Sequence, residues 1–170
     1  IGYETAKAIA KEGAELIIVG RNAEKTKTVA EELKTASGNQ NITFLLADLS
    51  SMAAVRKLAA DFLAKYDRLD VLVNNAGGVN MTHEKTVDGF ELTFAANHLS
   101  YFLLTNLLVP ALEKAAPSRV VCVASEAHRG ATIDFADLMT EPYSSFKAYG
   151  RSKLANILFG RELAKRLEKK

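Results

Sequence analysis

Short apolar runs alternate with amphipathic helical segments along this chain of 170 residues. The apolar runs are rich in β-branched residues and cover residues 14–20, 41–47, 69–75 and 118–125. Continuous runs of this kind are typical of parallel strands that are buried on both faces. The segments with helical periodicity cover residues 2–12, 23–36, 51–66, 88–115 and about 144–168. The alternation predicts an α/β fold, a doubly wound parallel sheet with helices on both faces and right-handed crossovers.

Turn signals agree with this division. Gly13 follows the first helical segment, where a residue with positive φ is wanted. Asp48 and Ser50 stand before the helix predicted over 51–66 and are candidate N-caps. There is no repeat, low-complexity tract or linker, so residues 1–170 are predicted to form a single domain.

Composition narrows the class of protein. The chain is 48% hydrophobic and 25% charged with a net charge of +2, close to a soluble globular domain and too weakly basic to favour nucleic acid. Cys122 is the one cysteine, which excludes an internal disulfide and favours a reducing, cytoplasmic location. We expect it to be a small buried apolar residue with no cation near enough to activate it. No apolar stretch approaches the roughly 18 residues that span a bilayer, so no membrane segment is predicted.

Polar residues follow each predicted strand. They are Gly20-Arg21-Asn22, Asp48-Leu49, Asn74 to Gly78, and Ser125. Polar residues at a single strand end are common and carry little weight. Because the carboxyl ends of parallel strands meet at one edge of the sheet, where such folds bind ligands, the four clusters together predict a ligand crevice.

The N-terminal residues fit a dinucleotide in that crevice. Ile1-Gly2 open a helix where a Gly-rich turn would bring backbone N–H groups to a pyrophosphate. Arg21 ends the second strand of such a unit, where an arginine suits the 2′-phosphate of NADP and a carboxylate would suit NAD. The alternatives are that Arg21 is an ordinary exposed loop residue and that Ile1-Gly2 simply begin a helix. We predict NADP(H) rather than NAD(H).

Tyr149 and Lys153 stand one helical turn apart, so they share a face. In most proteins such a pair is a simple contact. The alternative is chemical, because a neighbouring ammonium lowers the pKa of a phenol toward the working pH and makes it a proton donor and acceptor.

These pieces together resemble the short-chain dehydrogenase/reductase family. The matching motifs are "IG" at the N-terminus, "NNAG" at 74–77, "NHLSYFLLTNLL" at 97–108, "VAS" at 123–125 and "YGRSK" at 149–153. Within the family, the stretches "SEAHRGATIDFADL" and "SKLANILFGRELAKRL" look most like the branch of retinol dehydrogenases and the WW-domain oxidoreductase. The resemblance implies a Rossmann-type, three-layer α/β/α domain.

The resemblance also implies roles for four residues. Tyr149 would be the general acid/base that exchanges a proton with the carbonyl or carbinol oxygen. Lys153 would lower the pKa of Tyr149 and bind the nicotinamide ribose, and Ser125 would hold the substrate oxygen. Asn97 would support a water that relays protons to Lys153.

For the cofactor, the resemblance implies that Asn75, Ala76 and Gly77 pack along the dinucleotide and that Asp48 and Leu49 contact adenine. Ile1, Gly2, Arg21, Asn22, Tyr149 and Lys153 complete the predicted cofactor set. The expected reaction is NADP(H)-dependent oxidation or reduction of an apolar alcohol, aldehyde or ketone, with a homodimer face on the helix over 88–115. A non-catalytic, nucleotide-sensing relative and a nucleotide-sugar epimerase are the alternatives.

The chain departs from the family pattern at both ends. Most of the Gly-rich turn and the strand before it are missing, as are the later strands and the substrate-binding helices, so the domain is expected to be partial and poorly active alone. The missing first strand would lie mid-sheet, leaving its two neighbours with unpaired backbone. The segment between Ser125 and Tyr149 is expected to wall the substrate site. His83, His98 and His128 lack metal-ligand spacing, so no metal is predicted, and His98 is expected to hydrogen-bond locally.

Overall fold

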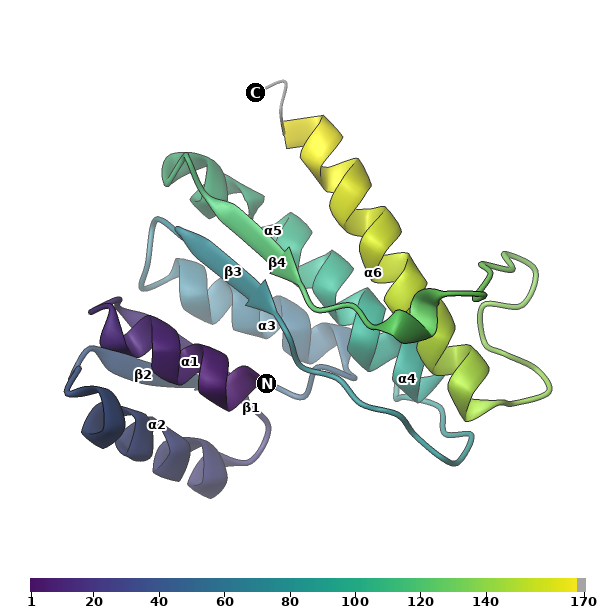
Figure 1. The fold of residues 1–170 in the computed structure, drawn as a ribbon, viewed down its shortest axis with the longest axis horizontal. Helices are drawn as coiled ribbons and strands as arrows, with labels where there is room; N and C mark the ends of the chain where they lie inside the picture. The colour runs from purple at the N-terminus through teal and green to yellow at the C-terminus, as the bar shows by residue number, and fades with distance from the viewer. Residues whose placement is uncertain (168–170) are drawn as a thin grey trace.

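The computed structural model describes residues 1–167, and its elements follow the predicted alternation of strands and helices (Figure 1). They are α1 (Gly2–Lys11), β1 (Leu16–Gly20), α2 (Ala23–Ser37), β2 (Ile42–Leu46), α3 (Met52–Leu63), β3 (Val71–Asn74), α4 (Leu92–Phe94), the π-helix η1 (Ala95–Leu99), α5 (Ser100–Lys114), β4 (Arg119–Cys122), the 3-10 turn η2 (Glu126–His128) and α6 (Ser145–Leu167). All predicted strands and helices exist, and the α/β class is confirmed. The predicted end of the last helix at residue 168 lies outside the described residues.

All strand pairing in the described part of the chain is parallel, as predicted, but the strands form two separate pairs. β1 pairs with β2 in a register that runs from Leu16 opposite Ile42 to Gly20 opposite Leu46. β3 pairs with β4, with Val71 opposite Arg119 at the start.

Helices cover both faces of the strands (Figure 1). One apolar cluster joins α1 and α2 to β2 through Ala10, Ala30, Leu33 and Ile42, and Ile18 of β1 packs against it. A second cluster joins α3 to α5 through Ala59, Phe62, Leu108 and Ala111, and Ile17 of β1 packs against that one. Adjacent residues of one strand thus face opposite clusters, as the period of two in a strand requires. This confirms the three-layer arrangement.

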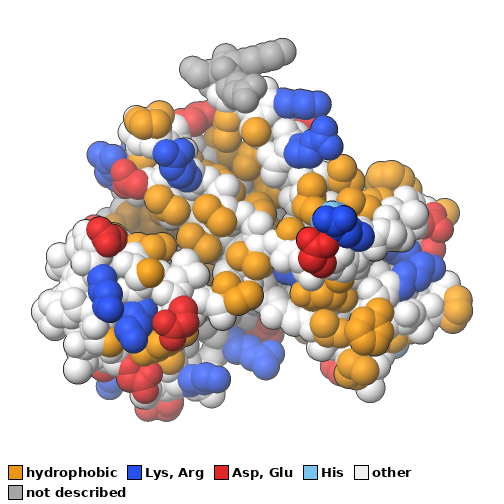
Figure 2. All heavy atoms as spheres, in the orientation of Figure 1, with side chains coloured by type: hydrophobic (Ala, Val, Ile, Leu, Met, Phe, Trp, Pro, Cys, Tyr) orange, Lys and Arg blue, Asp and Glu red, His pale blue; other side chains and the backbone are white. Residues whose placement is uncertain are grey.

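An open slot separates β1 from β3. A cavity of about 1220 Å³ is lined by Leu16–Gly20 on one side and by 71–74 on the other, and Figure 2 shows apolar side chains at the surface of this face. We call it the β1–β3 slot. In a parallel ladder alternate residues bond to the same neighbour. The Leu16 N–H donates to Asn41 on the β2 side, so the peptide groups of Ile17 and Val19 face the slot.

The same reasoning applies to β3. The carbonyls of Asp70 and Asn74 accept from residues 119 and 123 on the β4 side, so the peptide groups of Val71 and Val73 face the slot. The side chains of Val19 and Val71 are 42% and 47% exposed. The two strand edges with unpaired backbone that the sequence predicts are therefore present, one on each side of the slot.

Exposed apolar strand edges promote association, and charged side chains on an edge suppress it. We predict that Val19→Lys and Val71→Lys each reduce self-association of the 170-residue chain, measured by static light scattering against concentration. Val87→Lys is the matched control, because Val87 is 88% exposed but lies in a loop away from both strands. Equal self-association of all three variants and the parent chain would contradict the assignment of these strand edges as the surface that promotes association.

Two helix starts differ from the predictions. The helix expected from residue 88 begins at Leu92, because Gly89 has a φ of 82° and Glu91 is the N-cap. The Glu91 carboxylate accepts from the N–H groups of Thr93 and Phe94, both at 2.7 Å. The sequence pattern did not reveal this cap, since glutamate is not a typical N-cap residue.

The N-cap of α3 is Ser51, whose hydroxyl accepts from Ala54 N–H at 3.3 Å. The expectation that Asp48 or Ser50 is the cap was wrong. Asp48 instead accepts from the N–H and hydroxyl of Ser50 at 2.9 and 2.7 Å, which fixes the turn before the helix. The prediction for Gly13 is confirmed, with a φ of 81°.

The expectation that no stretch is long and apolar enough to cross a membrane was also wrong. The continuous helix over Leu92–Lys114 meets that test by length and composition, and half of its most apolar window is buried inside the protein. Small polar residues such as Thr105 interrupt the apolar run, so the sequence shows no continuous apolar stretch of this length. Leu108 and Ala111 of this helix pack in the cluster with α3, so the core of the domain accounts for much of its apolar character.

Candidate active site

Lys153 is buried on α6, where its ammonium is held by the end of β4. The residue is 4% exposed, and Nζ donates to the carbonyl of Val123 at 2.9 Å. Nζ also lies 5.6 Å from the centroid of the Tyr149 ring, within the range of a cation–π contact. Burial lowers the pKa of Lys153, because desolvation disfavours the charged form. The structure therefore brings the two predicted residues of this helix together at the carboxyl edge of the strands.

Ser125 lies two residues beyond the carbonyl that Lys153 binds. It is half-buried, and its hydroxyl accepts from the N–H of Ala127 at 3.2 Å as the N-cap of η2. The Lys153 contact and the η2 turn thus fix the strand end and the segment of Ser125 against α6.

Gly150 allows η2 to approach α6. A Cβ at this position would lie 2.6 Å from the Ala127 carbonyl oxygen and 3.4 Å from the Ala131 Cβ. Because a backbone atom is the obstacle, any larger residue would push η2 away from the helix. A glycine directly after Tyr149 therefore sets the spacing between the Ser125 segment and the Tyr149 helix.

We predict that Gly150→Ala destabilises the fold by about 1 to 3 kcal/mol, since the added methyl overpacks a rigid contact. Gly160→Ala on the same helix is the control, because a Cβ there meets nothing within 4 Å and should stabilise by about 0.5 to 1 kcal/mol through helix propensity. Urea unfolding measures both. Equal effects would show that η2 can shift without cost.

Asn97 occupies the π-helix η1, an element that often marks functional positions. Its side-chain Nδ2 donates to the Gly78 carbonyl at 2.9 Å and to the Ser152 hydroxyl at 3.1 Å, and its Oδ1 accepts from Gly78 N–H at 3.0 Å. A Cβ at Gly77 would lie 2.6 Å from the same Oδ1, so this approach requires glycine. Asn97 therefore ties the loop after β3 to α6.

The backbone carbonyl of Asn97 accepts from Nδ2 of Asn156 on α6 at 2.9 Å. Asn156 Oδ1 lies 2.9 Å from Nδ1 of His98. The expectation that His98 bonds locally was wrong, because its partner is on another helix that packs against η1. Burial lowers the pKa of His98, which favours the neutral ring in this contact.

Three further residues, which no motif role predicts, help to build the site. Tyr101 donates its hydroxyl to the Ala76 carbonyl at 2.8 Å, and burial raises its pKa. Ser152 bridges Asn97 to the Tyr149 carbonyl, to which it donates at 2.7 Å. Asn156 is the third. All three lie within the motifs that carry the family resemblance. The one sign of their burial in the sequence is that they are polar residues on otherwise apolar helices.

The predicted cofactor residues of the N-terminus and of the loop after β3 meet. A Cβ at Gly2 would lie 2.5 Å from Asn75 Nδ2, so α1 begins directly against that side chain. Ile1 is 87% exposed at the same point. Gly2, Asn75 and Ala76 all line the large cavity. A glycine-opened helix beside an exposed strand-end loop is a cradle that suits a pyrophosphate.

The residues expected near adenosine lie at the end of β1 and β2. Arg21 is exposed, and Asn22 caps α2 by accepting from Lys25 N–H at 2.9 Å. Hydrogen bonds from Ser50 hold the pKa of Asp48 below its usual range, with a smaller contribution from the charge of Arg21. Arg21, Asn22 and Leu49 line the same cavity as Gly2. The donor set therefore fits a dinucleotide, although the side chain of Asn22 is already used as a cap.

Cys122 is partly buried and has a cation nearby, contrary to expectation. Asn74 Nδ2 lies 3.8 Å from its sulfur, and the charge of Lys153 acts on it. Burial is the larger effect and raises the pKa of the thiol, so the prediction that Cys122 is not an activated nucleophile stands.

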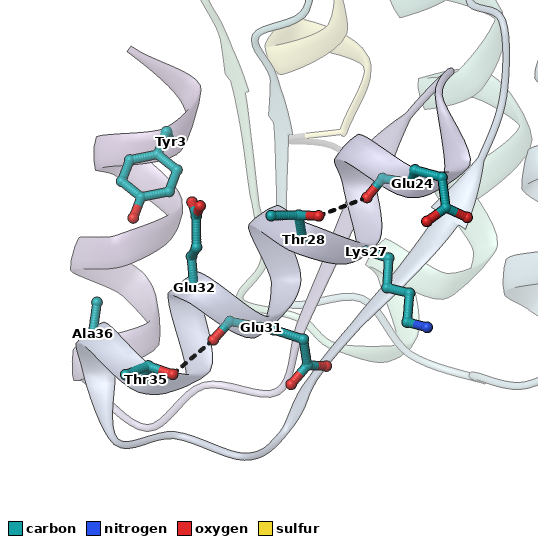
Figure 3. A pocket seen from close by; sticks show the side chains of 8 residues that line it. All are labelled: Tyr3, Glu24, Lys27, Thr28, Glu31, Glu32, Thr35 and Ala36. Carbon is teal, nitrogen blue, oxygen red and sulfur yellow. Dashed lines mark hydrogen bonds between the residues drawn. The ribbon is translucent and has the colours of Figure 1, made fainter.

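Figure 3 shows a separate hollow of about 700 Å³ between α1 and α2. It is lined by Tyr3 and by α2 side chains, among them Thr28 and Thr35, which donate to the carbonyls of Glu24 and Glu31. None of the predicted site residues lines it, and we assign it no role.

Comparison with known proteins places the chain in a family. The family model described as short chain dehydrogenase matches residues 1–170. The chain belongs to the short-chain dehydrogenase family. Retinol dehydrogenase 11 of Homo sapiens is 47% identical over 169 residues, which are 99% of this chain and 53% of that protein. The predicted retinol-dehydrogenase-like branch is confirmed. The chain spans about half the length of the curated relatives it matches.

Solved structures support the same fold. An uncharacterized protein from Mycobacterium Paratuberculosis is 38% identical, with a TM-score of 0.86 over 99% of this chain and 59% of that one. The Pseudomonas aeruginosa RhlG/NADP active-site complex is 33% identical, with a TM-score of 0.77 over 96% of this chain and 61% of that one. The Rossmann-type fold is thus confirmed, and the short-chain dehydrogenase family binds a nicotinamide cofactor.

Proposed function

We propose that the full-length protein is an NADP(H)-dependent oxidoreductase that acts on an apolar alcohol, aldehyde or ketone. The observation that carries this is the buried Lys153 ammonium, fixed on the Val123 carbonyl and one helical turn from Tyr149. A desolvated cation beside a phenol at the strand-end crevice is the arrangement that proton exchange with a bound alcohol or carbonyl requires. The name of the human relative, retinol dehydrogenase, supports the same reaction class.

Each residue of the site has a proposed task. Tyr149 exchanges the proton with the substrate oxygen, and Lys153 stabilises the phenolate that results. Ser125, at the head of η2, holds the substrate oxygen in place. Asn97 keeps the loop after β3 against α6, and its carbonyl has capacity for a further hydrogen bond to a relay water. The nicotinamide supplies the hydride when it is bound.

Tyr149→Phe tests this mechanism, because it removes the proton donor and keeps the ring. We expect kcat to fall about 100-fold or more, the typical contribution of general acid–base catalysis. The dissociation constant for NADPH should stay within about twofold, since the ring still packs in the same place. The measurements are NADPH oxidation with an apolar aldehyde and fluorescence titration of NADPH. Turnover that survives the substitution would reject the mechanism, and no turnover by the parent enzyme with any carbonyl would favour a nucleotide-sensing relative.

The preference for NADP(H) over NAD(H) is proposed from Arg21. This residue is exposed beside the Asn22 cap and lines the same cavity as Gly2 and Asn75. A guanidinium can hold a 2′-phosphate through paired hydrogen bonds and stack on adenine. A structural relative solved as a complex with NADP supports the same choice.

Arg21→Asp should shift the ratio of kcat/KM for NADPH to that for NADH toward NADH by about tenfold or more, since a phosphate contact is replaced by like-charge repulsion. Lys27→Asp is the matched control, because Lys27 is an exposed cation one turn into α2 that lines the separate hollow of Figure 3 instead of this cavity. An unchanged ratio in Arg21→Asp would mean that Arg21 is an ordinary loop residue.

Two exposed apolar residues, one in the loop after β3 and one before the Tyr149 helix, support an apolar substrate. Met81, in the loop after β3, is 72% exposed, and Phe135, in the segment before α6, is 85% exposed. We propose that they contact the body of the substrate. A cytoplasmic location and a dimer through the helix over Leu92–Lys114 remain proposals that rest on the sequence.

A further inference from the structure

The turn of η1 that carries Asn97 is held by side chains as well as by its own backbone. The Ser100 N–H donates to the Ala95 carbonyl, five residues back, which is the spacing of a π-turn. Side-chain donors reach the next two carbonyls. The Ser100 hydroxyl donates to Ala96 at 2.7 Å, and Asn156 Nδ2 donates to Asn97 at 2.9 Å. One of these added donors thus comes from another helix, α6.

The helix α6 binds Asn97 at two points, one on its side chain and one on its main chain. Asn97 Nδ2 donates to the Ser152 hydroxyl at 3.1 Å, and the Asn97 carbonyl accepts from Asn156. Ser152 and Asn156 are four residues apart, so they lie on the same face of α6. All three residues are 0% exposed. The two contacts fix the orientation in which the Asn97 amide meets both the N–H and the carbonyl of Gly78.

His98 fixes which way the Asn156 amide faces. A carbonyl can only accept a hydrogen bond, so the amide nitrogen of Asn156 faces Asn97 and its oxygen faces His98. Asn156 Oδ1 lies 2.9 Å from His98 Nδ1, and this oxygen can also only accept. The ring must therefore carry a hydrogen on Nδ1. Three phenylalanine rings flank His98 at centroid distances of 5.2 and 6.4 Å, so the ring is packed in place as well as bonded.

These contacts end at the loop after β3, beside the proposed dinucleotide site. Asn97 bonds both polar groups of the Gly78 backbone, at 3.0 and 2.9 Å. Asn75 and Ala76, three and two residues earlier, line the large cavity. Tyr101, on the helix that continues η1, donates to the Ala76 carbonyl at 2.8 Å. The placement of η1 on α6 therefore decides where this loop lies.

An apolar side chain in place of Asn156 would be the simpler choice if stability were the only requirement. A buried amide must keep partners for its polar atoms, and an unsatisfied one costs free energy. A satisfied buried network, in contrast, specifies one arrangement of the groups that it joins. The buried amide of Asn156 therefore points to a role in geometry.

We infer that Asn156, oriented by His98, is a positioning residue that holds the Asn97 turn so that Asn97 fixes the loop at Gly78 for NADP(H) binding. The inference rests on the proposed oxidoreductase function. It assigns Asn156 and His98 no contact with substrate or cofactor. Loss of either contact should loosen the loop and weaken NADPH binding, whereas a purely structural role would change stability and leave cofactor affinity alone.

The test uses the full-length protein with substitutions that preserve packing. Asn156→Leu keeps the volume and removes both hydrogen bonds, and His98→Phe keeps a ring and removes the donor. His98→Asn is the conservative variant, because its Nδ2 is as many bonds from Cβ as the ring Nδ1 and can donate to Asn156. Asn106→Leu is the matched control. The exposed Asn106 makes the same kind of bond, from Nδ2 to the Phe102 carbonyl at 2.7 Å.

Hydrogen exchange at the Gly78 amide, followed by NMR, reports the loop without any cofactor, because this N–H donates to Asn97 Oδ1. We expect exchange about tenfold faster in Asn156→Leu and His98→Phe, since a lost buried hydrogen bond favours local opening. The Val123 amide is the internal reference and should stay within about twofold. It donates to the Asn74 carbonyl at 2.9 Å, beyond the end of β4.

Fluorescence titration gives the dissociation constant for NADPH. We expect it to rise about tenfold in Asn156→Leu and His98→Phe, and to stay within about twofold in His98→Asn and Asn106→Leu. A double-mutant cycle with Asn97→Ala separates positioning from general destabilisation. In that background, Asn156→Leu should change the dissociation constant by less than about twofold, because the side chain through which it acts is absent.

The outcomes separate the inference from the function on which it rests. Unchanged Gly78 exchange in Asn156→Leu overturns the inference, as does an unchanged dissociation constant or an equal effect with and without the Asn97 side chain. If Asn156→Leu does not fold, His98→Phe must show both changes, and its failure to do so overturns the inference. A parent protein that binds NADPH but reduces no carbonyl overturns the proposed function alone, and one that does not bind NADPH overturns both.

Discussion

The hydrogen bond from the Lys153 ammonium to the Val123 carbonyl is the contact on which the rest of the site depends. It joins α6 to the end of β4, and it buries a cation that water would otherwise solvate. The fixed carbonyl accepts from one of the three N–H groups of the ammonium and so holds the charge beside the Tyr149 ring. A competing acid at this place would hold the cation and remove its influence on the phenol.

Much of the fold could be predicted from the sequence, because its strongest signals are local. Continuous apolar runs gave the strands, and helical periodicity gave the helices within a few residues of their observed ends. The predicted start of a helix was wrong where an unusual side chain is the N-cap, as Glu91 is for α4. The prediction about membrane-spanning stretches was wrong for a related reason. Residues such as Thr105 are polar in the sequence but are buried in the fold.

The candidate site divides in the same way. Tyr149, Lys153, Asn97 and Gly77 could be found because motifs with fixed spacing carry them, and the structure brings them to one edge. Gly150 could not, although it lies between Tyr149 and Lys153. Its importance comes from a partner more than ten residues away, the Ala127 carbonyl, and no spacing rule reports such a contact. Packing between residues that are far apart in the chain cannot be predicted from a single sequence.

The two strand pairs have a mechanical consequence. Arg21 and Asp48 belong to the pair β1–β2, whereas Ser125 and Lys153 belong to the side of β3–β4, and the packing of α3 on α5 bridges the halves. The two nucleosides of a dinucleotide are joined by one pyrophosphate, which limits how far apart they can lie. Any change in the width of the β1–β3 slot would therefore change the distance that the ligand must span. The width of this slot thus sets the separation between the two halves of the binding cleft.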